Sequence, residues 1–462
     1  MQRVICAAVL LSLTGCASGP NYGPPAVADL GVPATFSTRT DQPLDEAELA
    51  DWWSQFHDPQ LNALVERAVA ANLDIVQAEA RLRQAREASL QAGASLLPSV
   101  GASGNGGRNF NSSTGDRNSF SLGLDASWQL DLFGGVRRGV EAARADEAAS
   151  RYNLAAVRVA IISEVVTNYI QLRLAQEQLR IAQATVSNQR DNRDIAGWRV
   201  QAGLVSSLDE QQARTQLAQT EATIPGLQTS MRNALNRIAV LTGQAPGQAT
   251  EALEAAAAIP GPPPGITAGF PADTLRQRPD VRAAERGLAA ATARVGVAEA
   301  QLLPSLGISG NIGSSALSVG SLFDIVTGSL FAGVNQAIFQ GGALRSQVRS
   351  QKAAVDGALA AYRQSVLAAL EDVENALQAG TAADAREAQL AIAEDAANNS
   401  ALLARMQYQS GLTDFQTLLT AEQSLLSASN SRAATKAEQA LAVVQLYNAL
   451  GGGWQTMDGN GE

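Results

Sequence analysis

The chain has 462 residues, a formal net charge of −10 and only 5% aromatic residues. The acidic balance argues against a nucleic-acid partner, because phosphates require a basic surface. One histidine, His57, and two cysteines leave no cluster of His and Cys for a metal and no Ser-His triad. Neither a catalytic residue nor a metal site is therefore predicted, and His57 is expected to be structural.

The N-terminus has the pattern of an export signal. A positive residue precedes the short apolar segment Val4–Leu13, as in secretory signal peptides. The segment ends Leu13-Thr14-Gly15-Cys16, which resembles the bacterial lipobox. Residues 1–15 are therefore predicted to be removed and Cys16 to become a lipid-modified N-terminus. In such lipoproteins Ala17, in place of aspartate, favours the outer membrane. An ordinary secretory signal with a chance cysteine is the alternative.

Residues 16–60 are predicted to form a lipid-anchored tether. Prolines and glycines are scattered through residues 17–50, and they favour an extended chain over a domain. The aromatic residues Trp52, Trp53 and Phe56 are expected to anchor the tether to the helices that follow. No segment of the mature chain has 18 consecutive apolar residues, so no transmembrane helix is predicted.

One unit is written twice, with an offset of 206 residues. The sequence LLPSVGASGNGG at Leu96–Gly107 returns as LLPSLGISGNIG at Leu302–Gly313. Two tandem repeats are therefore assigned, joined by a segment rich in Ala, Gly and Pro. The assigned ranges are repeat 1 at 61–243, the linker at 244–272, repeat 2 at 273–453 and a C-terminal tail at 454–462.

Each repeat contains one predicted β-hairpin, at 99–133 and at 305–340. Between Phe120 and Leu132 every second residue is apolar, which predicts a strand with one apolar and one polar face. The loops of the two hairpins are predicted at Arg108–Asn118 and Ser314–Gly328.

Long helices flank the hairpins. The spacing of apolar residues predicts one helix from Leu61 to Ala94. It also predicts two much longer ones, from about Gly139 to Gln201 and from Ala343 to Gln409. The two long helices would each span about 95–100 Å.

A shorter helix follows each long one after a turn that contains glycine. Ser207 and Thr413 are predicted to cap these shorter helices, because an acidic or amide residue follows each of them three positions later. Pro225 lies inside the first of them and is predicted to kink it.

Four strands per chain cannot close a barrel. Two chains would supply eight strands, a number whose interior is filled by side chains. Three chains would supply twelve, the smallest closed number here with an open lumen. The sequence therefore predicts an oligomer, and a pore requires at least three copies.

The motifs and their order resemble the outer membrane efflux proteins, the TolC/OprM-like outer membrane factor family, in its lipoprotein branch. The resemblance implies a mixed α and β fold, mostly α, with a long α-helical barrel and a transmembrane β-barrel formed by a homotrimer. The matching positions are Leu13–Cys16, Trp52-Trp53, Phe56, Asp58-Pro59, Leu97-Pro98, Trp128–Gly135, Arg278–Glu285, Leu303-Pro304 and Gly341-Gly342.

The resemblance also implies a function. Such a protein is the outer membrane exit duct of a tripartite efflux system, which passively conducts drugs or metabolites and is not an enzyme. Its implied partners are a periplasmic adaptor, a proton-driven inner membrane pump and outer membrane lipid. Its one implied modification is the covalent lipid on Cys16, with no other cofactor.

The helical turns are the implied contact points for the adaptor. The first is Gly203-Leu204-Val205-Ser206, and the second begins Gly411-Leu412. The alternative is that the glycines only make tight turns, but a tight turn alone does not require exposed Leu204, Val205 and Leu412.

The second turn is also the implied periplasmic gate. Asp414 is expected as the first residue of the last helix, where three copies on a symmetry axis would form a ring of carboxylates. A plain role at the positive end of the helix explains Asp414 equally well. Thr413, Tyr408 and Arg405 are the further gate candidates.

Two other classes of function stay open at this point. One is the exit duct of a type I protein secretion system, which would share the architecture. The other is a structural coiled-coil lipoprotein, which would leave the alternating strand at residues 120–132 unexplained.

Overall fold

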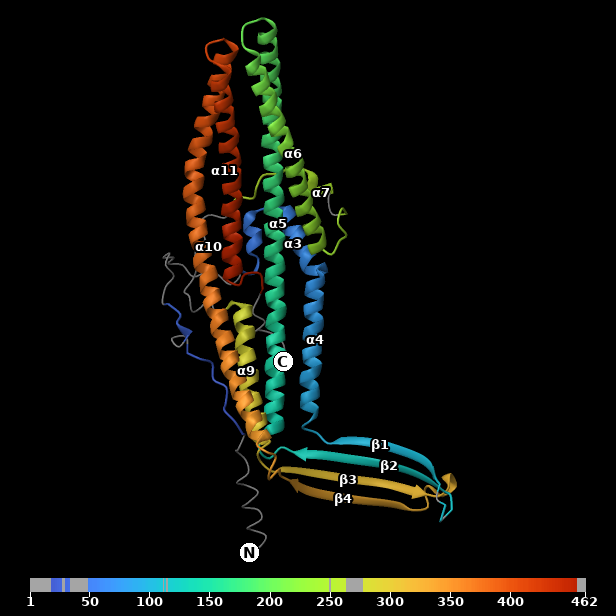
Figure 1. Ribbon diagram of the computed structural model, residues 1–462. Helices are drawn as coiled ribbons and strands as arrows, with labels where there is room; N and C mark the ends of the chain where they lie inside the picture. Colours follow the sequence, from blue (N-terminus) through green and yellow to red (C-terminus); the bar gives the residue numbers. More distant parts are fainter. Residues whose placement is uncertain are drawn as a thin grey trace. The chain divides into compact units, whose positions relative to one another are not determined.

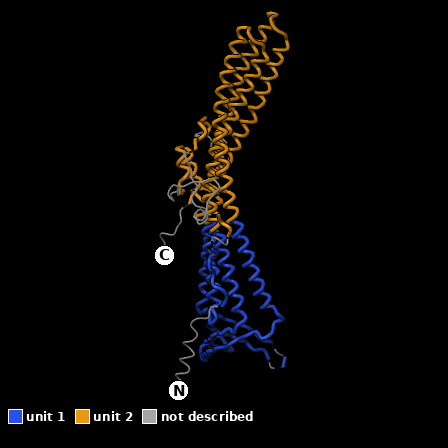
Figure 2. The backbone as a smooth tube through the Cα atoms, turned by 90° about the vertical axis from the view of Figure 1, so that its left-hand side faces the viewer, with its two compact units in different colours: residues 1–26, 80–153, 282–365 blue, residues 27–79, 154–281, 366–462 orange. Residues whose placement is uncertain are grey.

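The computed structural model describes residues 18–26, 30–33, 49–110, 112–113, 115–248, 251–262 and 277–454. The predicted signal peptide, Cys16, most of the C-terminal tail and parts of the tether and linker lie outside these residues. Contacts within the chain define two compact units (Figure 2). Unit 1 comprises residues 1–26, 80–153 and 282–365, and unit 2 comprises residues 27–79, 154–281 and 366–462.

Unit 1 contains an antiparallel four-stranded sheet with the strand order β1-β2-β3-β4 (Figure 1). The pairing of β2 with β3 joins the two repeats, and β1 and β4 are the two edges of the sheet. The bounds are β1 Ser99–Asn109, β2 Arg117–Leu130, β3 Ser305–Ala316 and β4 Val326–Asn335.

The strands end earlier than the sequence predicted. β2 stops at Leu130 and β4 at Asn335, whereas the hairpins were expected to reach 133 and 340. Asp131 ends β2, because its carboxylate accepts the backbone N–H groups of Val136 and Arg137 at the start of the next helix. β4 ends where its partner strand begins, since Asn335 pairs with Ser305. The second loop is also shorter than predicted and contains the 3₁₀ helix η3, Val319–Ser321.

The predicted alternation is confirmed and extends across all four strands. Residues paired across antiparallel strands share a face, so the register determines the faces of the whole sheet. Residues 120, 122, 124, 126, 128 and 130 of β2 pair with 316, 314, 312, 310, 308 and 306 of β3. This face is mostly apolar, and the opposite face carries polar residues and glycine with the exception of Phe331.

The long helices match the prediction closely. α10 spans Ala343–Gln409 as expected, and α5 spans Gly135–Gln201, starting four residues earlier than expected. The other helices are α3 Pro59–Ala71, α4 Leu73–Ala94, α6 Ser207–Leu241, α7 Glu251–Glu254, α9 Pro279–Ala300 and α11 Phe415–Ala449. Pro225 lies within α6, and the kink expected there stays a prediction.

The single helix predicted from Leu61 to Ala94 is two helices, because Asn72 interrupts it. Asn72 has an extended ψ of 130°, and its side-chain oxygen accepts the N–H groups of Asp74 and Ile75. Its amide nitrogen donates to the carbonyl of Leu241, 3.0 Å away, at the end of α6. Asn72 is therefore the cap of α4 and also binds the end of a second helix.

The aromatic anchor predicted for the tether is confirmed in the described part of unit 2. Trp52 and Phe56 of the 3₁₀ helix η2, Trp52–Phe56, are buried in the main core of this unit. The Trp52 ring stacks on Tyr447 of α11 with 5.2 Å between centroids.

Helix α5 contains a stretch long and apolar enough to cross a membrane by length and composition alone. Its side chains Val165, Val166 and Ile170 are fully buried in the core of unit 2. Part of this apolar character therefore serves packing within the chain.

The first described residues are held in unit 1. The Ser18 N–H donates to the carbonyl of Phe133, 2.8 Å away and just after β2. The buried guanidinium of Arg138 donates to the Ser18 carbonyl and to Asn21 Oδ1, and the Tyr22 hydroxyl donates to Glu285. Residues 18–22 are thereby fixed within unit 1, with Ser18 just beyond the end of β2.

Candidate functional site

The two helical turns in unit 2 have the same backbone geometry. Gly203 and Gly411 have positive φ angles of 67° and 75°. The N–H of Leu204 donates to the Arg199 carbonyl at 2.9 Å, and that of Leu412 donates to the Gln407 carbonyl at 2.8 Å. Both are Schellman turns, in which glycine adopts the left-handed conformation after the helix.

The leucines that follow these glycines are exposed. Leu204 is 73% exposed and Leu412 is 78% exposed, although the residue at this position of a Schellman turn often packs back on its own helix. Val205 is half-buried, so the expectation that it is exposed is wrong. Leu208 in the first turn of α6 is 59% exposed and was missed. The exposed apolar residues of the first turn are therefore Leu204 and Leu208.

The two turns differ in the residue that caps the next helix. Ser206 caps α6, with its hydroxyl accepting the N–H of Leu208, and Asp414 caps α11, with its carboxylate accepting the N–H of Thr417 at 2.8 Å. The predicted caps Ser207 and Thr413 are both off by one residue. Asp414 precedes the helix instead of starting it, and Thr413 is half-buried.

The hydrogen bonds at Asp414 affect its ionisation. Donation from Thr417, by side chain and backbone, holds the pKa of the exposed Asp414 carboxyl below its usual value. Asp414 is therefore ionised at neutral pH and carries its negative charge at the tip of the second turn.

Tyr408 lies in a small core behind the second turn. It is fully buried, and its ring contacts Phe415 with 5.5 Å between centroids. Arg199 of α5 places its guanidinium carbon 4.6 Å from the centre of the Tyr408 ring and donates to the Gln409 carbonyl. Arg199 joins α5 to the end of α10 and was missed, because nothing in its local sequence sets it apart.

Arg405 belongs to a separate buried cluster. Its guanidinium donates to Glu422 of α11 at 2.9 Å, and Asn192 of α5 donates to the same carboxylate oxygen at 2.7 Å. Three helices are thus joined through Glu422, which is buried. The structure does not bring Arg405 to Asp414, so these two gate candidates act at different places.

Asp209 also lies near this core. Burial raises the pKa of the Tyr408 hydroxyl, the Arg199 charge lowers it, and the Asp209 charge raises it. Asp209 is therefore electrostatically coupled to Tyr408.

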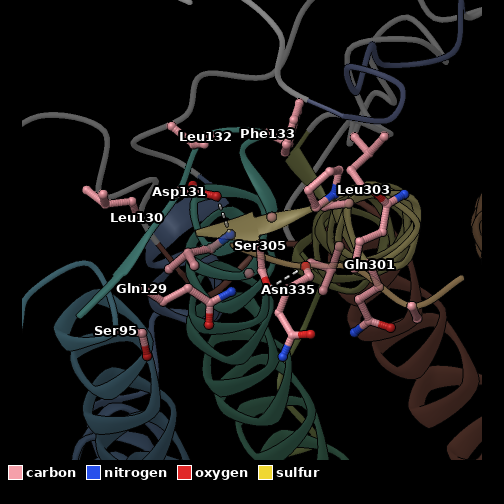
Figure 3. A pocket seen from close by; sticks show the side chains of 18 of the residues that line it. Ser95, Gln129, Leu130, Asp131, Leu132, Phe133, Gln301, Leu303, Ser305 and Asn335 are labelled. Carbon is pink, nitrogen blue, oxygen red and sulfur yellow. Dashed lines mark hydrogen bonds between the residues drawn. The ribbon is translucent and has the colours of Figure 1, made fainter. Parts of the chain in front are cut away.

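A cavity of about 760 Å³ lies in unit 1 where the sheet meets the helices (Figure 3). Amide and hydroxyl side chains line much of it, and Leu132, Phe133, Leu303 and Leu344 add apolar contacts. The polar lining residues include Ser95, Gln129, Gln301, Ser305, Asn335, Gln336 and Gln340. Such a lining is more polar than is usual for a site that binds one small ligand tightly.

His57 has a structural position. It is exposed and has a φ of 51°, and it follows the last residue of η2. Among the described residues no group of three or more His, Cys, Asp and Glu side chains is placed to hold a metal ion.

A four-stranded sheet with one apolar face, joined to helices of 67 residues, defines a class of channel that combines strands and long helices. The family model described as outer membrane efflux protein matches residues 64–244 and 270–452. The chain belongs to the outer membrane efflux protein family, and its fold carries the tandem repeat of that family.

Full-length relatives agree with this assignment. The pyoverdine export outer membrane protein OpmQ of Pseudomonas putida is 34% identical, with 98% of each chain covered. Nodulation protein T of Rhizobium leguminosarum bv. trifolii is 32% identical, with 96% of each covered.

Solved structures show the same fold. The outer-membrane channel OprN is 36% identical with a TM-score of 0.88, over 96% of this chain and 100% of that one. The open state of the Neisseria gonorrhoeae MtrE outer membrane channel is 28% identical with a TM-score of 0.85, over 95% of this chain and 98% of that one. The protein is an outer membrane efflux channel.

Proposed function

We propose that three copies of this chain assemble into one continuous duct and that this duct is the outer membrane exit of a tripartite efflux system. Four strands from each copy give twelve, enough for a barrel with an open lumen. The free edge of β4 in one copy would pair with the free edge of β1 in the next, which leaves no exposed edge.

The observation that carries this proposal is the two-faced sheet. Strands of 10 to 14 residues are long enough to cross a bilayer. The apolar face around Leu122, Leu124 and Trp128 would contact lipid. The polar face, with Asn311 and Asp125, would line the water-filled lumen.

The cargo that fits this duct is small molecules. Named relatives serve pyoverdine export, cation efflux and antibiotic efflux, so the cargo of this chain is a small molecule of that range, such as a drug or a metabolite. Transport would be passive here, without a catalytic step. An inner membrane pump, driven by protons, and a periplasmic adaptor would deliver the cargo.

Three measurements test this function together. The purified protein should form ion-conducting channels in planar bilayers and should run as a trimer by native mass spectrometry. Deleting the protein should make the cell retain small toxic compounds, and expression of the intact chain should restore export. A protein that neither conducts nor assembles contradicts the proposal.

The exposed leucines of the turns are the proposed contacts for the adaptor. Leu204 and Leu412 leave apolar surface uncovered at the two turns, as at sites that receive a partner. They stand beside Gly203 and Gly411, which shape the turns, and beside half-buried Val205 and exposed Ser206.

Charged replacements at these leucines test the adaptor site. Leu204→Glu together with Leu412→Glu should abolish export while leaving trimer formation and bilayer conductance intact. The control is Leu402→Glu, a half-exposed leucine on α10 away from the turn, which should export normally. Normal export by the double variant would move the adaptor site elsewhere.

The second turn is the proposed gate. The exposed and ionised Asp414 stands at its tip, and three copies on an axis would form a ring that attracts cations. Thr413 is part of the turn. Tyr408 and Arg405 would hold α5 against α10 and α11 in the closed state of the gate.

The proposed lipid anchor is Cys16. Ser18, two residues later, is bound to Phe133 beside the end of β2, which would place a lipid on Cys16 at the level of the membrane surface. Mass spectrometry of the mature N-terminal peptide should find a lipid-modified Cys16, whereas cleavage elsewhere would contradict it. Cys16→Ser should loosen membrane anchoring more than it harms folding.

A further inference from the structure

The segment that follows β2 of repeat 1 packs against repeat 2 at the end of the sheet. The segment Leu132–Gly135 leads into α5, and Leu132 and Phe133 line the same cavity as Leu303 and Pro304 (Figure 3). A Cβ placed on Gly135 would stand 2.8 Å from the Cβ of Ala300, at the end of α9. The segment between β2 and α5 of repeat 1 therefore packs closely on the end of α9 in repeat 2.

The two apolar residues of the matching segment in repeat 2 are exposed. Ile338 and Phe339 precede α10 as Leu132 and Phe133 precede α5. They are 89% and 88% exposed, and a Cβ on Gly341 or Gly342 would meet no atom within 4 Å. Two neighbouring large apolar side chains with this exposure indicate a contact surface without its partner.

The surface that would receive them is also bare. The repeat 1 equivalents of Ala300 and Leu303–Pro304, 206 residues earlier, are Ala94 and Leu97–Pro98. Leu97 is 67% exposed and Ala94 is exposed. Within one chain the two surfaces stand at opposite edges of the sheet, since β1 and β4 are separated by β2 and β3 (Figure 1).

The helices that lead into these surfaces, α9 and α4, also differ in how much of them is covered. In unit 1, α9 is joined to α5 by the pair Arg294–Asp146 and to α10 by the pair Lys352–Glu299. The ion pair described for α4 in this unit, Arg86–Glu147, joins it to α5 alone. Most residues of α9 are buried, whereas the corresponding part of α4 is largely exposed. One neighbour of α4 is missing from the single chain.

We propose that the segment Ile338–Gly342, here called the β4–α10 knob, packs on Ala94–Pro98 of a second copy of this chain. It would do so as Leu132–Gly135 packs on Ala300–Pro304 within one chain. This inference rests on the proposed trimer and names the side chains that seal its interface beneath the barrel. Another copy is the fitting partner, because the receiving surface is the repeat equivalent of one already filled inside the chain.

The repeat also fixes the register of the strands that meet. In the pair β2·β3, the numbers of paired residues add up to 436, as for Leu130 and Leu306. Adding 206 to a residue of β2 gives its equivalent in β4, and subtracting 206 from a residue of β3 gives its equivalent in β1. The sum therefore stays 436 when β4 pairs with the neighbour's β1, so Val334 pairs with Ala102. This register puts the apolar faces of both strands on one side, and a slip of one residue would reverse them.

Disulfide trapping tests barrel closure independently of the knob. Val334→Cys on a chain with one tag and Ala102→Cys on a chain with another tag are co-expressed and oxidised. Directly paired strand residues are close enough for a disulfide, so a covalent pair carrying both tags is expected. The shifted combination of Val334→Cys with Gly101→Cys should give none.

A second pair of variants tests the knob itself. Ile338→Cys and Leu97→Cys on separately tagged chains should be joined by a short bismaleimide linker. Leu132→Cys with Leu303→Cys on one chain calibrates the linker, because their positions line one cavity and the link should stay within the chain. The unmodified chain is the blank, since its two cysteines, Cys6 and Cys16, lie in or next to the predicted signal peptide.

Removal of the aromatic ring gives the energetic test. Phe339→Ala should raise the dissociation constant of the trimer by about tenfold or more, as expected when a buried phenylalanine side chain is lost. Phe110→Ala is the control, because Phe110 is 77% exposed at the other end of the sheet and should leave assembly unchanged.

The outcomes separate the inference from the function on which it rests. If the Val334–Ala102 disulfide forms, the trimer stands, and either a missing Ile338–Leu97 link or an unchanged Phe339→Ala trimer overturns the knob. If the disulfide is absent and native mass spectrometry finds only monomers, both the knob and the proposed assembly are wrong.

Discussion

The two repeats use different side chains at equivalent helix breaks and helical turns. At the break between the paired helices, repeat 1 uses Asn72 to bind the Leu241 carbonyl, and repeat 2 uses Arg278 to bind the Ala449 carbonyl. At the helical turn, repeat 1 caps the next helix with Ser206 and repeat 2 with Asp414.

Two glycine positions that end helices, by contrast, are the same in both repeats. Gly243 and Gly451 have positive φ angles of 71° and 76°, and Gly203 and Gly411 have 67° and 75°. The difference teaches that glycines fix the backbone of each repeat, while the residues beside them are free to diverge in charge. Charge is therefore where the repeats have specialised.

The largest effect is expected at the glycines that close α6 and α11. A Cβ on Gly243 would stand 2.6 Å from the Ala71 carbonyl oxygen, and one on Gly451 would stand 3.0 Å from the Arg278 Cα. Gly243→Ala should lower the free energy of unfolding by roughly 2–5 kcal/mol, from left-handed strain and overpacking together. Gly451→Ala should cost about 1–3 kcal/mol, since its contacts are looser.

Thermal unfolding followed by circular dichroism in detergent compares the two variants. Gly226→Ala serves as a control, because a Cβ on Gly226 would meet nothing within 4 Å inside α6. Equal losses for Gly243→Ala and Gly451→Ala would mean that backbone strain alone, and not the close approach, decides the cost.

The next largest effect is expected at the helix breaks. Asn72→Ala removes the cap of α4 and leaves the buried Leu241 carbonyl without its donor, which should cost about 2 kcal/mol. Arg278→Ala likewise leaves the Ala449 carbonyl without its donor, but it removes no helix cap. It should cost less, about 1 kcal/mol, because its partners Asp280 and Asp372 remain accessible to water. Chemical denaturation measures both, and a larger loss for Arg278→Ala would reverse the comparison.

The two turns are expected to differ more in conduction than in stability. Asp414→Ser keeps a capping oxygen, as Ser206 has, and should leave the stability nearly unchanged. Removal of the carboxylate should raise single-channel conductance and weaken cation preference in planar bilayers. The change should be larger below 0.1 M salt, because the screening length there exceeds about 10 Å.

The reciprocal change in the first turn is the matched control. Ser206→Asp should leave conductance and selectivity unaltered, since only the second turn is the proposed gate. If Asp414→Ser conducts like the unmodified protein, Asp414 is a helix cap and the constriction lies elsewhere.

The smallest effect is expected from acid. The lowered pKa of Asp414 means that its cap stabilises α11 fully above the unfolded-state pKa of about 3.9. This stabilisation is lost as the pH falls through the lower pKa of the folded state. Hydrogen exchange at the start of α11 should therefore rise below about pH 4, and Asp414→Ser should remove this dependence. An identical rise in the serine variant would assign it to other carboxylates.

The sequence by itself determined the repeat, the alternating strand and the long helices. The repeat offset, the period of two at residues 120–132 and the uninterrupted apolar spacing at Ala343–Gln409 are local patterns, and local patterns suffice when every turn of an element repeats the same environment. The glycines that end α5 and α10 were readable for the same reason, because few residues accept a left-handed backbone.

Only the tertiary structure decided which polar side chain caps each helix and which one interrupts a helix. By residue type, either Ser206 or Ser207 could cap α6, and either Thr413 or Asp414 could cap α11. The backbone direction after each glycine turn decides that Ser206 and Asp414 are the caps. Asn72 breaks a helix because the Leu241 carbonyl, 169 residues away, stands within reach of its amide. In the sequence, Ile338 and Phe339 look like ordinary apolar residues. The strand order shows that they follow an edge strand and are exposed. A local pattern carries no information about such partners, since their positions are set by packing between segments far apart in the chain.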